Sequence, residues 1–214
     1  MPATKSVVIS CAGTGSRLGL AKTKALITID GRALISYQLE LFRDVEDVRV
    51  VVGFQANDVI EEVLKYRSDV IFVYNHNYFE TKTGASFYLG AKDAYEYVLE
   101  YDGDLLIHPD DMKKCLNMNG EFIAYSQKTS NNAVYVKTNS VGDVISFSRE
   151  NGDFEWTGPA CVKKNKLRFS SEHVYNQLES YLPMKGLEIR ACDIDTYEDY
   201  VHAQEIVKSW SNDK

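Results

Sequence analysis

The sequence VVISCAGTGSRLGLAKTKALITI, residues 7–29, decides how the N-terminal part of this chain folds. Its first residues, 7–9, form a continuous apolar run, which is typical of a strand covered on both faces. Gly13 and Gly15 follow closely, and glycine lets backbone N–H groups approach phosphate oxygens because no Cβ stands in the way. The stretch therefore predicts a strand that leads into a phosphate-binding turn.

Two common phosphate-binding motifs do not fit this turn. The dinucleotide fingerprint G-x-G-x-x-G fails because Leu18 stands where the third glycine should be. The P-loop pattern fails because no Gly-Lys-Ser/Thr follows the glycines. A third pattern, A-G-x-G-x-R followed by a lysine and a short apolar strand, is matched by Ala12, Gly13, Gly15, Arg17 and Lys24.

This third pattern resembles the nucleotidyltransferase superfamily, which makes nucleoside-diphosphate sugars and related activated metabolites. The resemblance implies catalytic roles for Lys24, on the α-phosphate side of a nucleoside triphosphate, and for Arg17, towards its β- and γ-phosphates. The residues expected to bind the nucleotide through the turn are Ala12, Gly13, Thr14, Gly15 and Ser16. The chain departs from the family at Thr23, because relatives usually have proline before the lysine.

Further apolar runs at 48–52, 70–73 and 105–107 alternate with helical patterns around 57–64 and 85–97. Runs of this kind suit parallel strands, and their alternation with helices predicts a Rossmann-like, doubly wound α/β fold with a mostly parallel sheet. The ligand crevice of such a fold lies beyond the carboxyl ends of its strands.

The second half of the chain has a different sequence pattern. Shorter strands and turns over about 121–165 predict a small, partly antiparallel extension that closes over the acceptor substrate. A helix over 172–182 and a strand over 187–193 follow, and Thr196 with Asp199 predicts a capping-box start for the last helix. We expect a single domain over residues 1–214.

Composition excludes several classes of protein. The formal net charge of -7 argues against a general nucleic-acid binder, which needs a cationic surface. The chain shows no long apolar run and no basic apolar segment at its N-terminus, so we expect a soluble, cytoplasmic protein without a membrane partner. The four cysteines form no metal-ligand pattern and are expected to be reduced and packed.

Nucleotidyl transfer brings an anionic acceptor to an anionic α-phosphate, so carboxylates are needed to hold a divalent cation there. The resemblance implies Asp110 as one magnesium ligand, because I-x-x-D aligns with Ile107 and Asp110 in LLIHPDD. It implies Asp195 as the other, in a segment similar to the family's DT-x-ED element. Asp111 is the rival of Asp110, and a helix-capping role is the alternative for each. Mg²⁺ is the expected cofactor.

The stretch YNHNYFETKTGASFYLG, residues 74–90, resembles small phosphocholine-type cytidylyltransferases, which implies CTP as the nucleotide and places Ser86 near its base. For the acceptor, Trp156 lies in a region comparable to the aromatic residues of choline-type enzymes. Lys82 stands where relatives often have asparagine, and it favours an acceptor with extra negative charge. The alternative is that Lys82 is a solvated loop lysine.

The leading hypothesis is a cytidylyltransferase that transfers CMP from CTP to a small phosphorylated or phosphonylated molecule and releases pyrophosphate. One alternative is a sugar-1-phosphate nucleotidyltransferase that uses UTP, dTTP or GTP. Another is an inactive nucleotide-binding regulator with the same fold. The acceptor's identity and a homodimeric state stay open.

Overall fold

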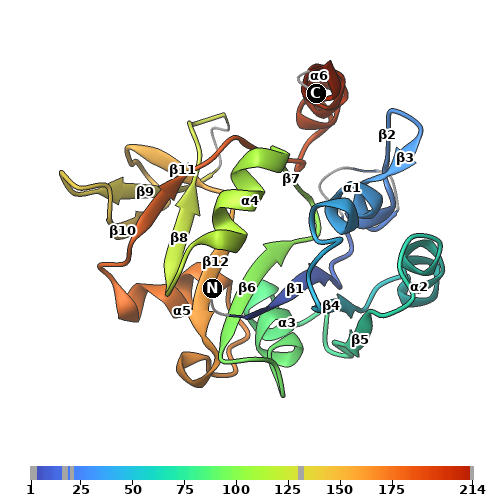
Figure 1. Cartoon of the computed structure of the whole chain (residues 1–214), viewed down its shortest axis with the longest axis horizontal. Helices are drawn as coiled ribbons and strands as arrows, with labels where there is room; N and C mark the ends of the chain where they lie inside the picture. Colours follow the sequence, from blue (N-terminus) through green and yellow to red (C-terminus); the bar gives the residue numbers. More distant parts are fainter. Residues whose placement is uncertain (1–3, 16–18, 20–21, 130–132, 213–214) are drawn as a thin grey trace.

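The computed structural model describes residues 4–15, 19, 22–129 and 133–212 (Figure 1). Its centre is a seven-stranded sheet in the order β13-β8-β12-β6-β1-β4-β5. The strands are β1 (Lys5–Cys11), β4 (Asp47–Val52), β5 (Ile71–Tyr74), β6 (Tyr97–Asp102), β8 (Phe122–Tyr125), β12 (Ala160–Lys163) and β13 (Gly186–Glu188).

Most neighbouring strands of this sheet run parallel. β1 pairs in parallel with β4 and β6, β4 with β5, and β13 with β8, whereas β12 is antiparallel to both of its neighbours. The expected α/β fold with a mixed, mostly parallel sheet is confirmed.

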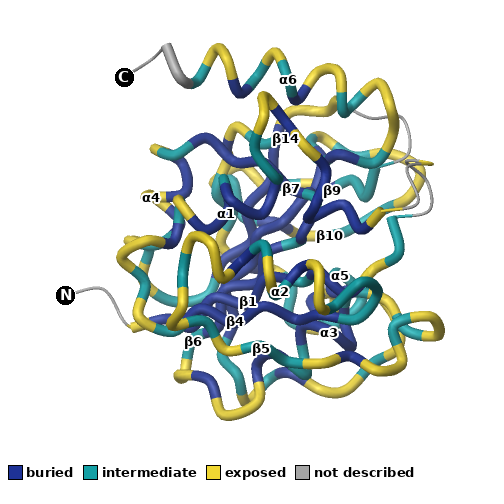
Figure 2. Tube along the Cα trace, turned by 90° about the vertical axis from the view of Figure 1, so that its right-hand side faces the viewer, coloured by how far each residue is buried: buried dark blue, intermediate teal, exposed yellow. Residues whose placement is uncertain are grey.

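Helices cover both faces of the sheet (Figure 1). They are α1 (Leu34–Leu41), α2 (Ala56–Leu64), α3 (Thr83–Gly90), α4 (Pro109–Asn117), α5 (Val174–Leu178) and α6 (Tyr197–Asn212). Successive side chains of a strand point to opposite faces. Accordingly, Val7 and Ile9 pack with α1, α2 and α4, whereas Val8 packs with α3 and α5. Figure 2 shows these buried strands running through the centre of the molecule.

Three smaller sheets complete the architecture. β9 (Val134–Thr138), β10 (Val144–Ser148) and β11 (Phe154–Trp156) form an antiparallel sheet in the order β10-β9-β11. The other two sheets pair β7 (Leu105–Ile107) with β14 (Ala191–Asp193), and β2 (Thr28–Ile29) with β3 (Arg32–Ala33). The expected extension over 121–165 is thus divided, because its outer strands β8 and β12 belong to the main sheet.

Two expectations about the middle of the chain are wrong. The run 105–107 is not a strand of the main sheet; that place belongs to β6, which precedes it. The expected helix over 85–97 ends at Gly90, and the chain then turns into β6. The charged residues Glu100 and Asp102 interrupt the apolar pattern of β6, so its sequence does not read as a buried strand, yet Glu100 is fully buried.

Other expectations are confirmed. All four cysteines are free and buried. At the start of α6, Thr196 N donates to Asp199 Oδ2 over 2.8 Å and Asp199 N donates to Thr196 Oγ1 over 3.2 Å, which is the reciprocal pattern of a capping box. Among the helices in the described part of the chain, none has the length and apolar character needed to span a bilayer.

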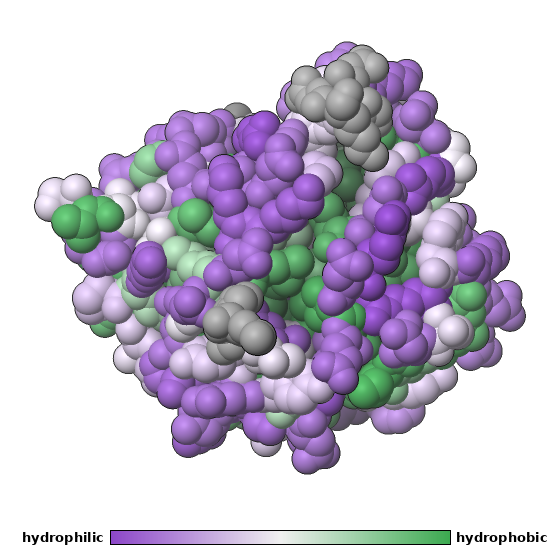
Figure 3. Space-filling view, in the orientation of Figure 1, coloured by the Kyte–Doolittle hydropathy of each residue, from purple (hydrophilic) through white to green (hydrophobic). Residues whose placement is uncertain are grey.

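A groove of about 770 Å³ lies between α1, α4 and α6. Figure 3 shows apolar residues gathered in a hollow below the C-terminal helix, with polar residues around it. Its apolar lining includes Leu41, Leu106, Ile107, Leu116 and Val207.

Candidate active site

A pocket of about 250 Å³ lies where β1 and β6 end. Four segments that are distant in sequence line it: the turn after β1, the residues around Lys24, the segment from Asn75 to the start of α3, and the turn 102–104. His173, just before α5, completes the lining. The pocket therefore lies at the carboxyl ends of parallel strands, the expected place for a ligand crevice in a doubly wound fold.

The glycine turn folds back on the segment that carries Lys24. Gly15 has a φ of +62°, and a Cβ at this position would lie 2.8 Å from the backbone oxygen of Lys22. Glycine is thus needed here for both its conformation and its small size. Ala12, Gly13, Thr14 and Gly15 all line the pocket, whereas Ser16 and Arg17 lie outside the described residues.

Thr23 has a backbone conformation that a proline could also adopt. Its φ is −60°, within the range that a proline ring imposes. Its N–H, which proline lacks, donates to Gln55 Oε1 over 2.8 Å. The neighbouring α2 thus anchors the segment before Lys24, and the position of the lysine does not depend on a proline.

Lys24 is buried and faces carboxylates from two other segments. Its Nζ lies 2.7 Å from Asp104 Oδ2 and also pairs with Asp195 Oδ1. Burial alone would lower the pKa of Lys24, but the negative charges of Asp104, Asp193 and Asp195 raise it above the ordinary value. The ammonium is therefore charged at neutral pH.

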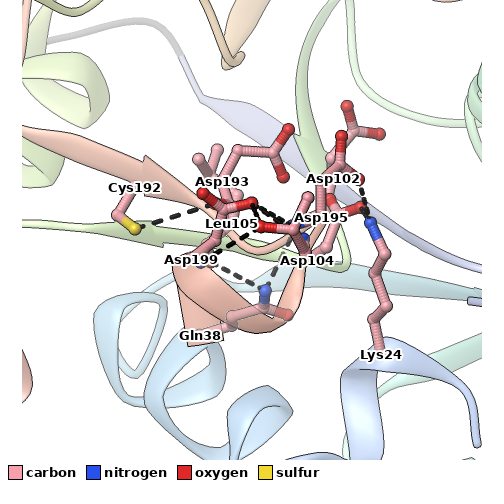
Figure 4. Close-up of polar contacts among 10 residues, drawn as sticks. Lys24, Gln38, Asp102, Asp104, Leu105, Cys192, Asp193, Asp195 and Asp199 are labelled. Carbon is pink, nitrogen blue, oxygen red and sulfur yellow. Dashed lines mark hydrogen bonds and ion pairs between the residues drawn. The ribbon is translucent and has the colours of Figure 1, made fainter. Parts of the chain in front are cut away.

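Asp104, Asp193 and Asp195 form an acidic cluster in which one carboxylate oxygen of each lies within 4.8 Å of the others (Figure 4). The pairing of β7 with β14 creates it, because Asp193 lies opposite Leu105 in that register. Asp104, directly before β7, thereby meets the end of β14, and Ile194 N donates to its backbone oxygen over 3.0 Å.

Buried contacts hold the turn that carries Asp104. Gln38 on α1 is fully buried, and its Nε2 donates to Leu105 O over 2.9 Å and to Asp102 O over 3.3 Å. Gly103 N donates to Ser10 O over 3.0 Å, and a Cβ on Gly103 would lie 2.6 Å from that oxygen. The turn is therefore packed tightly between α1 and the end of β1.

The acidic cluster fits a divalent cation. Carboxylate oxygens are the ligands that Mg²⁺ prefers, and three of them converge here beside the pocket. Asp193 Oδ1 is buried and has no hydrogen-bond partner in the described part of the chain. Burial and the neighbouring carboxylates of Asp104 and Asp195 raise the pKa of Asp193. A bound cation would therefore stabilise the ionised form of these carboxylates.

Two further acidic side chains lie beneath this cluster, on β6. Burial raises the pKa of Glu100 to about 8. Burial and the charges of Glu100 and Asp104 raise the pKa of Asp102 as well. A proton held within this pair therefore limits the negative charge that accumulates below the cluster.

The structure places Asp110 away from this acidic cluster. Asp110 is exposed in the first turn of α4, and its Oδ1 lies 3.8 Å from Lys113 Nζ. The acidic cluster does not include it, because β7 lies between Asp104 and Asp110 and spans roughly 10 Å by itself. Asp195 therefore meets Asp104, which lies at the other end of β7, and not Asp110.

The rival, Asp111, has a structural role. Its side chain is buried and lies 2.7 Å from Arg190 Nε and 2.6 Å from Lys114 Nζ. Burial by itself would raise the pKa of Asp111, but the hydrogen bonds from Arg190 and Lys114 lower it below the ordinary value. Asp111 thus ties α4 to the segment before β14.

Replacement of Asp111 by Asn is expected to lower the free energy of unfolding at pH 7 by about 1.5–3 kcal/mol, since it removes charged hydrogen bonds. Because the pKa of Asp111 is lower in the folded than in the unfolded state, its ionised carboxylate stabilises the fold at pH values above the unfolded-state pKa. This stabilisation is lost as the pH falls from about 5 towards the folded-state pKa. Urea unfolding at several pH values measures this. Asp110→Asn is the matched control, and an equal loss in both variants would contradict the assignment.

Of the residues expected near the base and the acceptor, Ser86 and Lys82 line the pocket and Trp156 does not. Ser86 is buried at the pocket, and its Oγ accepts a hydrogen bond from Asn75 Nδ2 over 3.1 Å. Lys82 also lines the pocket, with its exposed ammonium 3.1 Å from Glu172 Oε2. Trp156 is buried in an aromatic cluster with Phe147, and it is not among the lining residues of the pocket.

The sequence analysis missed four residues of this site: Asn75, Asp104, His173 and Asp193. Both missed aspartates carried a signal, since Asp104 follows Gly103 in the acidic turn DGD and Asp193 stands two residues before Asp195. Asn75 and His173 carried none, because their place at the pocket depends on how α3 and α5 pack.

Known proteins share this architecture. A family model described as a MobA-like NTP transferase domain matches residues 7–152. The bifunctional protein GlmU of Sulfurimonas denitrificans is 32% identical over 185 residues, which are 84% of this chain and 41% of that protein. The choline-phosphate cytidylyltransferase of Streptococcus pneumoniae is 26% identical over 230 residues, covering 94% of this chain and 98% of the relative. The chain spans less than half of the length of the GlmU relatives it matches.

Solved structures show the same fold. The CTP:phosphocholine cytidylyltransferase of Streptococcus pneumoniae superposes with a TM-score of 0.77 at 19% identity, covering 96% of this chain and 100% of that one. The inositol-1-phosphate CTP transferase of T. maritima superposes with a TM-score of 0.80 at 19% identity, covering 96% and 98%. The match of the family model to residues 7–152 shows that this chain belongs to the family of MobA-like NTP transferase domains.

Proposed function

We propose that the protein is a magnesium-dependent cytidylyltransferase, which transfers CMP from CTP to a small molecule bearing a phosphate or phosphonate. The observation that carries this proposal is the convergence of Lys24, the glycine turn and the acidic cluster on one pocket. The match to a choline-phosphate cytidylyltransferase over nearly the whole length of both proteins favours CTP.

The proposed reaction is a single displacement at the α-phosphorus of CTP. An oxygen of the acceptor's phosphate or phosphonate forms a bond to that phosphorus. The bond between the phosphorus and the oxygen that bridges to the β-phosphate breaks, and pyrophosphate leaves with its electron pair. No covalent enzyme intermediate is required, so the protein contributes positioning and electrostatic stabilisation.

The residues at the pocket have separate roles in this proposed reaction. Backbone N–H groups of the turn 12–15 bind phosphate oxygens, and Lys24 moves from its carboxylate partners to the α-phosphate. Asp104, Asp193 and Asp195 would hold Mg²⁺, which supplies neutralisation of the triphosphate charge when bound. Arg17 keeps its proposed role at the β- and γ-phosphates. Ser86, oriented by Asn75, faces the base.

Pyrophosphate release measured with CTP, UTP, dTTP, GTP and ATP tests this function. With Mg²⁺ and a panel of phosphate and phosphonate acceptors, we expect CTP to exceed each other nucleotide by about tenfold or more in kcat/KM, the discrimination that one or two good contacts provide.

The similarity to GlmU supports the second candidate, a sugar-1-phosphate nucleotidyltransferase. A preference for UTP, dTTP or GTP with a sugar 1-phosphate would establish that candidate. Nucleotide binding without pyrophosphate release from any acceptor would instead identify a regulator.

A further inference from the structure

We propose that the acceptor carries a second acidic group, a carboxylate or a further phosphate, which Arg149 binds beside an aromatic cluster formed by Phe147, Trp156 and Tyr175. This inference rests on the proposed function, and it concerns the end of the acceptor that does not react. It follows from the position of the aromatic cluster, from the cation on it, and from the pairing of the acidic residues nearby.

The aromatic cluster lies directly beside the pocket. His173 lines the pocket, and its ring stacks on Tyr175 with 5.8 Å between ring centroids and an interplanar angle of 15°. Tyr175 lies 5.7 Å from Phe147 and 6.0 Å from Trp156 by the same measure. One ring contact therefore links the pocket wall to the aromatic cluster, and we expect the other end of the acceptor to extend towards it.

A cation lies over one ring of this aromatic cluster. The guanidinium carbon of Arg149 lies 5.5 Å from the ring centroid of Tyr175, which is the geometry of a cation–π contact. A quaternary ammonium group needs such a ring face for itself, and here it would meet a like charge. A carboxylate or phosphate instead gains a planar, forked donor that suits its geometry.

Trp156 adds an uncommitted donor. The residue is only 8% exposed, and its Nε1 is buried without a hydrogen-bond partner among the residues that the structure describes. An unpaired buried donor is unfavourable, and an acceptor oxygen entering the aromatic cluster would satisfy it. The indole N–H therefore favours an anion over a cation in the same way as Arg149.

Two acidic side chains beside the aromatic cluster are paired within the protein. Glu172, next to His173, forms an ion pair with Lys82, with 3.1 Å between Glu172 Oε2 and Lys82 Nζ. Glu155, next to Trp156, accepts from Thr129 N over 3.0 Å and from Thr129 Oγ1 over 3.3 Å. Each of these two carboxylates thus has a partner in the protein, and the pair of Lys82 and Glu172 adds no net charge to the pocket wall.

Two matched pairs of acceptors test the proposal. 3-Phosphoglycerate differs from glycerol 3-phosphate, and phosphonoacetate from ethylphosphonate, mainly by a carboxylate. With CTP and Mg²⁺, we expect the acidic member of at least one pair to have a kcat/KM roughly tenfold higher, expressed mainly in KM, because charge-assisted hydrogen bonds are strong. Phosphocholine is expected to be the poorest acceptor.

Arg149→Gln is expected to remove most of this preference, and Arg43→Gln is the matched control. Arg43 is an exposed arginine beside α1 that pairs with Glu40 over 3.6 Å, so its replacement makes the same charge change away from the aromatic cluster. Loss of preference in Arg149→Gln alone supports the proposal. A preference for phosphocholine, or an acidic preference that Arg149→Gln leaves intact, would overturn it.

Calorimetry without turnover separates this inference from the proposed function. If no nucleotide yields pyrophosphate, the proposed function fails, but binding of the four acceptors to wild type and to Arg149→Gln still tests the role of Arg149. Tighter binding of an acidic member that depends on Arg149 supports the inference. Equal binding within both pairs, or no binding of any acceptor, contradicts it.

Discussion

Asp104→Asn is expected to reduce pyrophosphate release by about 100-fold or more, whereas Asp110→Asn is expected to stay within about twofold of the wild-type rate. Asp104 belongs to the acidic cluster and contacts Lys24 over 2.7 Å, but Asp110 is exposed on α4. Both changes replace a carboxylate with an amide of the same shape. The comparison therefore isolates the position of the charge.

Steady-state pyrophosphate release at several Mg²⁺ concentrations measures this effect. Asp195→Asn should behave like Asp104→Asn, because both residues pair with Lys24 and face the same cation site. Circular dichroism checks that each variant is folded. A large loss in Asp110→Asn together with a normal rate in Asp104→Asn would reject the acidic cluster as the metal site.

Lys24→Met is expected to lower turnover by about 100-fold or more, because it removes a buried cation placed for a phosphate oxygen. The same change should make the protein depend more on Mg²⁺ for its stability. In wild type the ammonium of Lys24 offsets the charges of Asp104 and Asp195, and in the variant these carboxylates repel one another until a cation binds.

Thermal unfolding with and without Mg²⁺ measures the second effect. We expect the rise in Tm on addition of Mg²⁺ to be larger in Lys24→Met than in wild type. Lys22→Met is the matched control, since Lys22 is exposed and two residues away. If Mg²⁺ raises the Tm of wild type, Lys24→Met and Lys22→Met equally, then Lys24 does not share its site with the cation.

Local sequence patterns were enough to predict the N-terminal part of the site. The run 7–9 forms the centre of β1, and the glycines follow it at the pocket, because strand, turn and lysine are close in sequence. The capping box of Thr196 and Asp199 likewise involves residues only three positions apart. Asp195, just before it, was predicted as a cation ligand and lies in the acidic cluster.

The partner of Asp195 was not predictable by the same means. Choosing between Asp104 and Asp110 required knowing that β6 belongs to the main sheet and that β7 pairs with β14. Glu100 and Asp102 make β6 hard to recognise from the sequence, since an apolar pattern is the main signal for a buried strand. These two carboxyl groups can lie together because both have raised pKa values, so a proton held within the pair removes a charge.

The sequence by itself determined the α/β class, the glycine turn and the lysine that follows it, because each depends on patterns within short stretches of the chain. Only the tertiary structure decided which carboxylates meet that lysine and which cation lies over one ring of the aromatic cluster. Those contacts join β7 with β14 and β10 with α5, and such pairings depend on register and packing across the whole chain. Spacing along the sequence does not encode them.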